Sequence, residues 1–191
     1  LRKAIELNPD YAKAHYNLGI IFKDLGKLQE AEKSTRKAIE LNPVFPLAHS
    51  NLGSIQRDLG KLQEAELSTR KAIELNPNLA EAHSHLGMIM NDLGRSKEAK
   101  LSWLKAIEIK PSLEESSFQL AEQLYNNKKY DLAINYLKGK NVNRSKSLYL
   151  GCLLCLDRKK DFDRKYLELS KNKICNAEIG GIIEHANIIY D

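Results

Sequence analysis

Two groups of side chains in this sequence have the types and spacing that chemistry requires. Cys152 and Cys155 form a CxxC pair, a pattern that in other proteins binds zinc or exchanges disulfides. The second group is a series of imidazoles spaced 34 residues apart, at His15, His49 and His83. Histidine is a common metal ligand and a common general base. Both groups are therefore candidates for a metal site or a catalytic site.

The cysteine pattern does not favour metal or redox chemistry. A structural zinc site needs about four ligands, usually from two such pairs, and the sequence contains three cysteines in all. A redox CxxC pair normally opens a helix, whereas this pair lies inside the apolar stretch GCLLCL. We interpret Cys152, Cys155 and Cys175 as core cysteines, with metal or redox use as the alternative, and predict no metal, cofactor or disulfide. Unpaired cysteines favour a reducing, cytoplasmic compartment.

The histidine series does not favour a metal site either. Equivalent residues of successive repeats lie about 10 Å apart per helix layer, whereas metal–nitrogen bonds are about 2 Å long. We expect these imidazoles to take the place of packing side chains. The sequence contains no nucleophile motif, phosphate-binding loop or paired-carboxylate motif, so it predicts no catalytic residues.

The elements that position these residues repeat with a fixed period. The stretch NLGIIFKDLGKLQEAEKSTRKAIELNP from Asn17 returns as NLGSIQRDLGKLQEAELSTRKAIELNP from Asn51, and a looser copy begins at His85. Residues 12–45 and 46–79 agree at 25 of 34 positions. A period of this size is the sequence signature of a repeat architecture, in which each unit packs on its neighbours.

Each unit has the pattern of two amphipathic helices. In the second copy, apolar residues three or four apart predict a first helix at 46–59, and a second helix is predicted at 62–75. Gly60 suits the end of the first helix, and Pro77 ends the second. The small residue Gly53 predicts that the two helices cross closely. The sequence therefore predicts an all-α protein built from helical hairpins.

These units resemble tetratricopeptide repeats over residues 1–137, and loosely over 144–171. The resemblance lies in Leu-Gly pairs, alanines and closing prolines that recur with the period: Leu18-Gly19, Leu52-Gly53, Leu86-Gly87, Ala31, Ala65, Ala99, Ala38, Ala72, Ala106, Pro43, Pro77 and Pro111. Histidines replace the aromatic residue of the first helix, Gln56 replaces a large apolar residue, and Thr35 and Thr69 replace an aromatic that Trp103 keeps. The resemblance implies a right-handed α-solenoid of helix-turn-helix hairpins.

The repeat pattern divides the chain into two regions. We expect tetratricopeptide repeats over 1–138, as a partial unit at 1–9 and units at 12–45, 46–79, 80–113 and 114–138. Residues 139–191 are predicted to hold a polar connection at 140–146, a degenerate repeat at 144–171 and a capping helix at 175–190. Because Leu1 falls inside a unit, we expect the sequence to be a piece of a longer protein. Its apolar residues Ala4, Ile5 and Leu7 predict self-association through the N-terminal face.

The resemblance also implies a binding groove lined by the first helices. The residues expected to face a bound protein or peptide segment there are Asn17, Ile20, Asp24, Asn51, Ser54, Asp58, His85, Met88, Asp92, Gln119 and Glu122. Asn17 and Asn51 are similar to the asparagine ladder in the repeat arm of peptide O-GlcNAc transferases, whose amides hold an extended peptide backbone. His85 and Gln119 depart from that ladder, and a solvated polar surface is the alternative. Tyr16 and Ile20 occupy the leading places of the clamp used by the chaperone-binding type, which argues against that partner.

The charge distribution points to protein partners. Residues 128–173 hold 13 Lys and Arg against 5 Asp and Glu, although the whole chain carries a formal charge of only +5. Because no aromatic-interleaved platform or groove-reading helix motif accompanies this basic stretch, an acidic partner or a role in solubility is favoured over nucleic acid. No apolar run of about 18 residues predicts a membrane span.

The sequence predicts a protein- or peptide-binding scaffold without catalysis of its own. Two alternatives remain open at this point. The chain could be the substrate-recruiting or oligomerising arm of a larger enzyme, such as a glycosyltransferase or an oxygenase, with a catalytic domain beyond Asp191. It could also serve self-association. The aspartates Asp24, Asp58 and Asp92 are expected to form an acidic line that favours basic or hydroxyl-bearing side chains of a partner.

Overall fold

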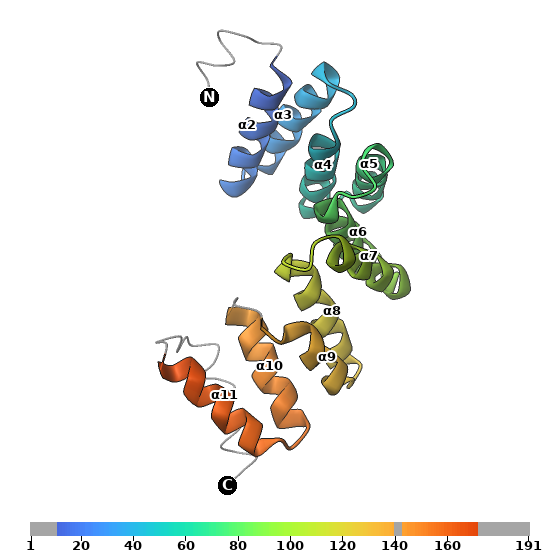
Figure 1. Cartoon of the computed structure of the whole chain (residues 1–191). Helices are drawn as coiled ribbons and strands as arrows, with labels where there is room; N and C mark the ends of the chain where they lie inside the picture. Colours follow the sequence, from blue (N-terminus) through green and yellow to red (C-terminus); the bar gives the residue numbers. More distant parts are fainter. Residues whose placement is uncertain (1–10, 140–142, 172–191) are drawn as a thin grey trace. The chain divides into compact units, whose positions relative to one another are not determined.

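Glycine and proline divide the chain into short helices, as the sequence predicts. The computed structural model describes residues 11–139 and 143–171, and all regular structure within these ranges is α-helical (Figure 1). The all-α prediction is confirmed. The chain forms two units, one ending at Leu113 and the other beginning at Glu114, and each is described by itself.

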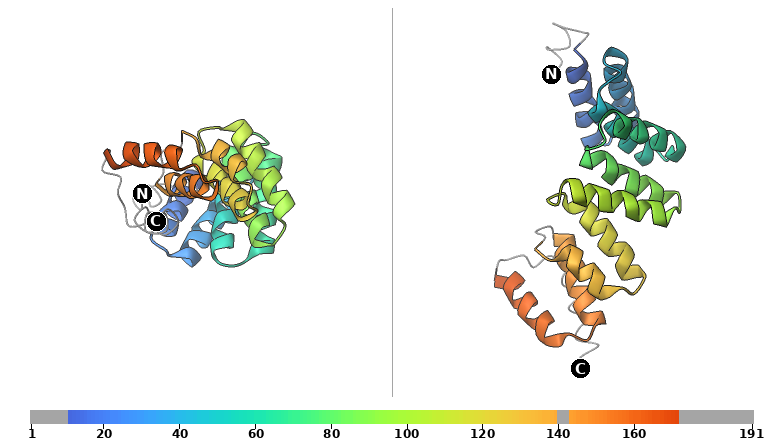
Figure 2. Two further views of the ribbon diagram at one scale, coloured as in Figure 1. Left: turned by 90° about the horizontal axis from the view of Figure 1, so that it is seen from below. Right: turned by 45° about the vertical axis from the view of Figure 1, so that its right-hand side comes forward.

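The first unit contains three hairpins of similar length. Its helices are α2 (Ala12–Asp24), α3 (Leu28–Leu41), α4 (Pro46–Asp58), α5 (Leu62–Leu75), α6 (Ala80–Asp92) and α7 (Ser96–Ile109). Each first helix pairs with the second helix that follows it, and α3 and α5 also pack on the next hairpin. The first helices α2, α4 and α6 contact one another in order, which is the stacking of a solenoid (Figures 1 and 2).

The turn inside each hairpin requires a residue with positive φ. Gly60 has φ +76°, and beyond it the amide of Lys61 donates to the carbonyl of Gln56 at 2.8 Å, which closes the end of α4. Gly26 and Gly94 have the same conformation in the other two hairpins. The predicted ends of the helices at 46–59 and 62–75 therefore agree with the structure to within one residue.

The two helices of each hairpin cross where the first helix has a glycine. A Cβ atom built on Gly53 would lie 3.0 Å from the carbonyl oxygen of Ala65, and closer still to the Thr69 hydroxyl. At the equivalent place in the third hairpin, a Cβ on Gly87 would collide with the ring of Trp103. The close crossing predicted from the glycine is confirmed.

Small buried alanines of the second helices, and the buried side chain of Gln56, lie in the same helix–helix contact. Ala31, Ala38, Ala65, Ala72, Ala99 and Ala106 are all fully buried. Gln56, which takes the place of an apolar residue, is 1% exposed, and its side chain donates to Glu64 at 3.1 Å and accepts from Ser68 at 2.7 Å. Because both ends of its amide are hydrogen-bonded, burial of the Gln56 side chain costs little free energy of desolvation.

The second unit contains one hairpin of the same kind and a looser one. Its helices are α8 (Glu114–Asn126), α9 (Tyr130–Leu137), α10 (Asn143–Cys155) and α11 (Lys159–Lys171). Gly139, with φ +77°, follows the short helix α9, as predicted. Lys128 and Asp157 adopt positive φ in the two hairpin turns, where the first unit has glycine.

The predicted polar connection at 140–146 is wrong for its last four residues. Helix α10 already begins at Asn143. The guanidinium group of Arg144 lies 4.4 Å from the centre of the Phe118 ring and pairs with the carboxylate of Glu115, both on α8. These contacts hold the polar segment against α8 and allow it to be helical.

Some predictions concern residues outside the described ranges. They are the apolar strip of Ala4, Ile5 and Leu7, the partial unit at 1–9, Cys175 and the capping helix at 175–190. Among the helices that the structure describes, none has the length and apolar character needed to cross a membrane.

We predict that Gly53→Ala destabilises the chain by about 1–3 kcal/mol, because the added methyl group must push α5 away from α4. Gly151→Ala is the matched control, since a Cβ there meets the Tyr125 ring at an ordinary 3.7 Å and alanine favours helix. Urea unfolding followed by circular dichroism measures both variants. Equal midpoints for the two variants would contradict the close crossing.

Candidate functional site

The residues predicted to contact a partner lie on the first helix of each hairpin. We call the part contributed by α2, α4 and α6 the first-helix face; its predicted members are Asn17, Ile20, Asp24, Asn51, Ser54, Asp58, His85, Met88 and Asp92. Asn17 and all three aspartates are exposed, Asn51 is half-buried and Ser54 is buried. Gln119 and Glu122 lie on α8 in the second unit, so the first-helix face has three hairpins rather than four.

Cations of one hairpin reach the aspartates of the next hairpin. The Nζ atom of Lys23 on α2 lies 3.4 Å from Asp58 on α4, and it also donates to the Ser54 hydroxyl. One repeat later, the Nε atom of Arg57 donates to Asp92 on α6 at 2.6 Å. Each of these side chains is about a third exposed or less. Partly exposed pairs contribute only about 0–1 kcal/mol each, so their main effect is on position and charge.

These ion pairs change the character of the predicted acidic line. Asp58 and Asp92 each form an ion pair with a basic side chain of the same chain, so little of their negative charge is available to a partner. Asp24 is exposed and has no ion pair with another residue in the described ranges. Sequence reasoning missed Lys23 and Arg57, although a basic residue directly before the aspartate in two successive units was the available signal.

The two asparagines of the face differ in their surroundings. The amide of Asn51 donates to the hydroxyl of Thr35 on α3 at 3.4 Å, a long and therefore weak hydrogen bond. Asn17 is exposed and makes no such bond with the described residues. The amide of Asn17 is therefore available to a ligand, and that of Asn51 is held by this weak bond alone among the described residues.

His85 takes the place of the third asparagine and is held by its neighbours. Its Nδ1 atom is hydrogen-bonded to the Ser50 hydroxyl at 3.0 Å. Burial lowers the pKa of His85 to about 4, and the positive charge of Lys23 lowers it further, against the opposing effect of Asp58. The imidazole is therefore neutral at neutral pH and can both donate and accept a hydrogen bond.

The recurring histidines have a structural partner. The Nε2 atom of His49 donates to the carbonyl of Pro43 at 2.9 Å, and His83 does the same to Pro77 at 2.8 Å. The imidazoles of His49 and His83 thus connect a first helix to the loop that precedes it. Among the residues that the structure describes, no three His, Cys, Asp or Glu side chains lie close enough together to hold a metal ion.

The two cysteines of the CxxC pair have different environments. Cys152 is buried, and this burial raises the pKa of its thiol to about 12. Cys155 is exposed, so the prediction of a core cysteine is wrong for this residue. It is the last residue of α10, and its Sγ atom lies 3.6 Å from the Tyr125 hydroxyl.

Hairpins whose two helices cross closely at a glycine, and whose first helices contact one another, define a helical-repeat protein. The tetratricopeptide repeat family matches residues 12–45, 46–79 and 80–113, which is more than half of the sequence. The chain belongs to the tetratricopeptide repeat family.

Solved structures share this fold. One is PilF of Pseudomonas aeruginosa, which is 20% identical with a TM-score of 0.77, over 96% of this chain and 86% of that chain. Another is YrrB, described as a TPR protein with an unusual peptide-binding site, at 20% identity and a TM-score of 0.61, over 99% and 91% of the two chains. The first TPR of Spaghetti (RPAP3), bound to the HSP90 peptide SRMEEVD, is 26% identical with a TM-score of 0.56, over 58% and 88%. None of the curated proteins that were compared matches the sequence significantly.

We predict that acid weakens the native state through His85. Its folded pKa of about 4 lies below the unfolded value of 6.5, so the unfolded state binds more protons between these values. The stability that the neutral imidazole contributes is complete above about pH 6.5 and is lost as the pH falls toward 4, by roughly 1–2 kcal/mol near pH 5.

The control is His85→Asn, which restores the residue type found at the same place in the other two repeats. Between neutral and mildly acidic pH, the urea midpoint should fall further for the native chain than for this variant. A native chain that loses no more stability than His85→Asn on acidification would refute the prediction. Burial raises the pKa of Glu32, but its hydrogen bonds with Lys61 and Arg36 lower it by more, and the hydrogen bond with Lys110 lowers the pKa of Glu81. Both carboxylates therefore affect stability only at lower pH.

Proposed function

We propose that this chain is a scaffold that binds an extended segment of a partner protein along the first-helix face. The observation that carries the proposal is the pair Asn17 and Asn51, one repeat apart on adjacent first helices, with side-chain amides that are exposed or only weakly engaged. An amide both donates and accepts, so it can pair with a peptide group of any sequence. The peptide-bound RPAP3 repeat and the peptide-binding site of YrrB support the same class of function.

The geometry of Asn51 suggests how binding proceeds. Its amide donates to Thr35 at 3.4 Å, and a peptide carbonyl at an ordinary distance would accept a stronger hydrogen bond from it. Because the Thr35 hydroxyl is fully buried, the exchange removes its Asn51 partner and offsets part of this gain. The net contribution of a new hydrogen bond is about 0.5–1.5 kcal/mol.

The ion pairs between hairpins shape the specificity of this face. Because Asp58 and Asp92 are neutralised by Lys23 and Arg57, the middle of the face recognises backbone and hydroxyl groups rather than basic side chains. Asp24 is the acidic group left to attract a basic residue of the partner. We therefore propose a sequence-tolerant site with one basic preference at the α2 end.

The scaffold is proposed to act without chemistry of its own. The tetratricopeptide fold of the described residues supports this, and Cys152 is protonated and buried. The alternative of a recruiting arm of a larger enzyme, and the likeness to the asparagine ladder of O-GlcNAc transferases, rest on the sequence.

We predict that replacing Asn17 and Asn51 by alanine weakens peptide binding by about tenfold or more, as two hydrogen bonds are lost. The probes are peptides selected from a random phage-displayed library against the native chain, then labelled with fluorescein and titrated by anisotropy. The control is Lys33→Ala with Lys37→Ala on the exposed side of α3, which should change binding little.

A variant with an added amide provides a second test of the proposal. His85→Asn adds a third amide at the same repeat position and should strengthen binding of the selected peptides. If the α3 variant abolishes binding and the asparagine variant does not, the opposite face of the stack is the binding surface and the proposal is wrong. Circular dichroism checks that each variant keeps its helical content.

A further inference from the structure

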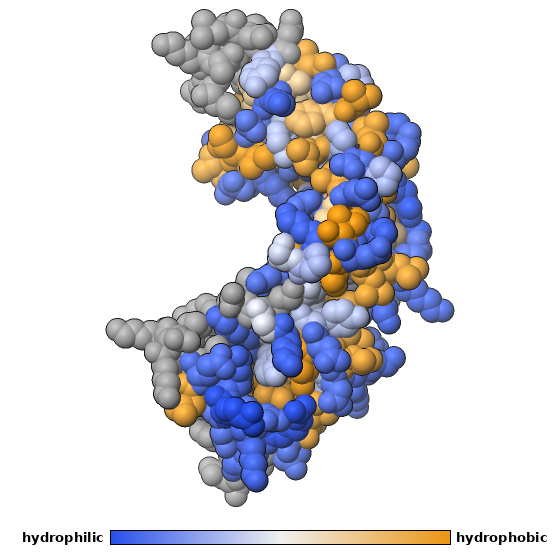
Figure 3. Space-filling view, viewed as in Figure 1, coloured by the Kyte–Doolittle hydropathy of each residue, from blue (hydrophilic) through white to orange (hydrophobic). Residues whose placement is uncertain are grey.

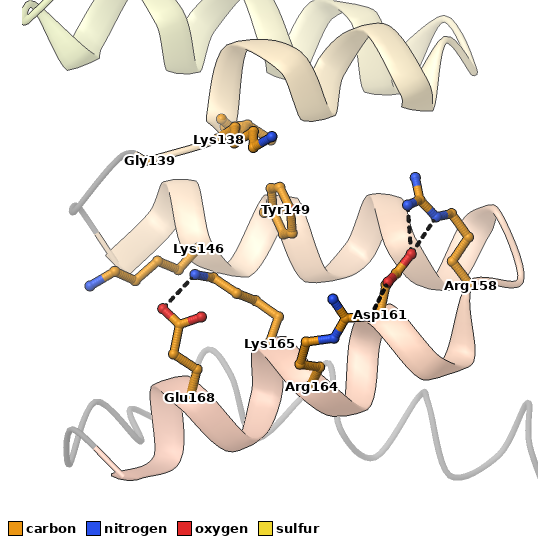
Figure 4. A pocket seen from close by; sticks show the side chains of 10 residues that line it. Lys138, Gly139, Lys146, Tyr149, Arg158, Asp161, Arg164, Lys165 and Glu168 are labelled. Atoms are coloured by element: carbon orange, nitrogen blue, oxygen red, sulfur yellow. Dashed lines mark hydrogen bonds and ion pairs between the residues drawn. The ribbon is translucent and has the colours of Figure 1, made fainter.

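A cavity of about 370 Å³ lies within the second unit, bounded by the end of α9 and by α10 and α11 (Figure 4). Besides Leu137, Gly139 and Tyr149, its lining consists of charged side chains: Lys138, Lys146, Arg158, Arg164, Lys165, Asp161 and Glu168. Five cations against two carboxylates leave a formal excess of three positive charges around this hollow. The cavity gives the basic stretch of the sequence a definite location, and Figure 3 shows the hydrophilic surface of this unit.

The carboxylates in the lining are already engaged. Asp161 accepts from Arg158 at 2.8 and 2.5 Å and from Arg164 at 3.0 Å, so a single negative charge is shared by two guanidinium groups. Glu168 accepts from Lys165 at 2.7 Å. Arg158 also lies 4.0 Å from the carboxylate of Asp131 on α9, so both arginines have an acidic partner.

The other two cations of the lining have no acidic partner in the part of the chain that the structure describes. The side chains of Lys138, at the end of α9, and of Lys146, on α10, make no hydrogen bond or ion pair with another residue that the structure describes. Cations that line one cavity from three elements produce a positive potential there, which raises the local concentration of anions. Lys138 and Lys146 thus carry the positive charge of the lining that no described carboxylate pairs with.

We propose that this cavity binds an acidic segment of a protein partner, with a short run of aspartate or glutamate side chains among its cations. Arginine binds a carboxylate through two parallel N–H groups, and the lysines add charge that adapts in position. Leu137 and Tyr149 provide apolar surface for the stems of the acidic side chains. The site differs in both location and chemistry from the first-helix face, so the two proposals stand independently.

The lining favours a peptide over a nucleic acid. Asp161 and Glu168 belong to the lining and would repel a continuous polyanion. Single-stranded nucleic acids also require exposed aromatic side chains on which bases stack. The aromatic residue in this lining, Tyr149, is half-buried.

The test is the titration of fluorescein-labelled hexaglutamate into the full chain at low salt, followed by anisotropy. Hexaglutamine and a short oligothymidylate are the comparison probes. The cavity variant is Lys138→Glu with Lys146→Glu. Its control is Lys128→Glu with Lys160→Glu, which makes the same change in net charge at exposed positions of the same unit, outside the cavity.

We expect hexaglutamate to bind the native chain and the control, and the cavity variant to lose about tenfold or more in affinity through like-charge repulsion. Equal losses in both variants, or no binding to the native chain, would overturn the proposal. So would tighter binding of oligothymidylate that is lost only in the cavity variant, since the site would then bind nucleic acid. If the double reversal lowers helicity, Arg164→Gln serves instead, because that side chain is 79% exposed.

Discussion

The close crossing of two helices at one glycine per hairpin is the constraint on which the first unit depends. At Gly53 the hydroxyl of Thr69 occupies the space where a side chain would begin, and the carbonyl oxygen of Ala65 lies 3.0 Å from it. This contact fixes both the distance and the rotation of α4 against α5. Asn51 and Ser54, on either side of the glycine in sequence, contact the preceding hairpin, where they meet Thr35 and Lys23. The residue that permits packing inside a hairpin therefore lies between the polar side chains that connect hairpins.

The sequence predicted the helices well because their ends depend on local chemistry. A glycine with positive φ or a proline acts on the residues next to it, and the 34-residue period shows the same signal three times. The predicted helices of the second copy accordingly match α4 and α5 to within one residue. The segment at 143–146 escaped prediction because its helical state depends on Glu115 and Phe118, which are far away in the chain.

The side-chain contacts of the candidate site were harder to predict for the same reason. The positions of Asn17 and Asn51 follow from the period, but the pairing of Lys23 with Asp58 depends on how one hairpin is rotated against the next. Cys155 was assigned to the core because its neighbours in sequence are apolar, whereas it is exposed as the last residue of α10. Periodicity therefore located the face, and packing between hairpins decided which of its charges are available.

The pairs Lys23–Asp58 and Arg57–Asp92 also bear on how such a chain can grow. Each unit supplies a cation to its successor and an aspartate to its predecessor, so an internal copy of residues 46–79 would bring both halves of the pairing with it. The series ends where Asn91 replaces the cation and Asn126 replaces the aspartate, so that neither charge is left over. A repeat array with this arrangement can lengthen by tandem duplication of its gene without gaining an unmatched charge at any new junction.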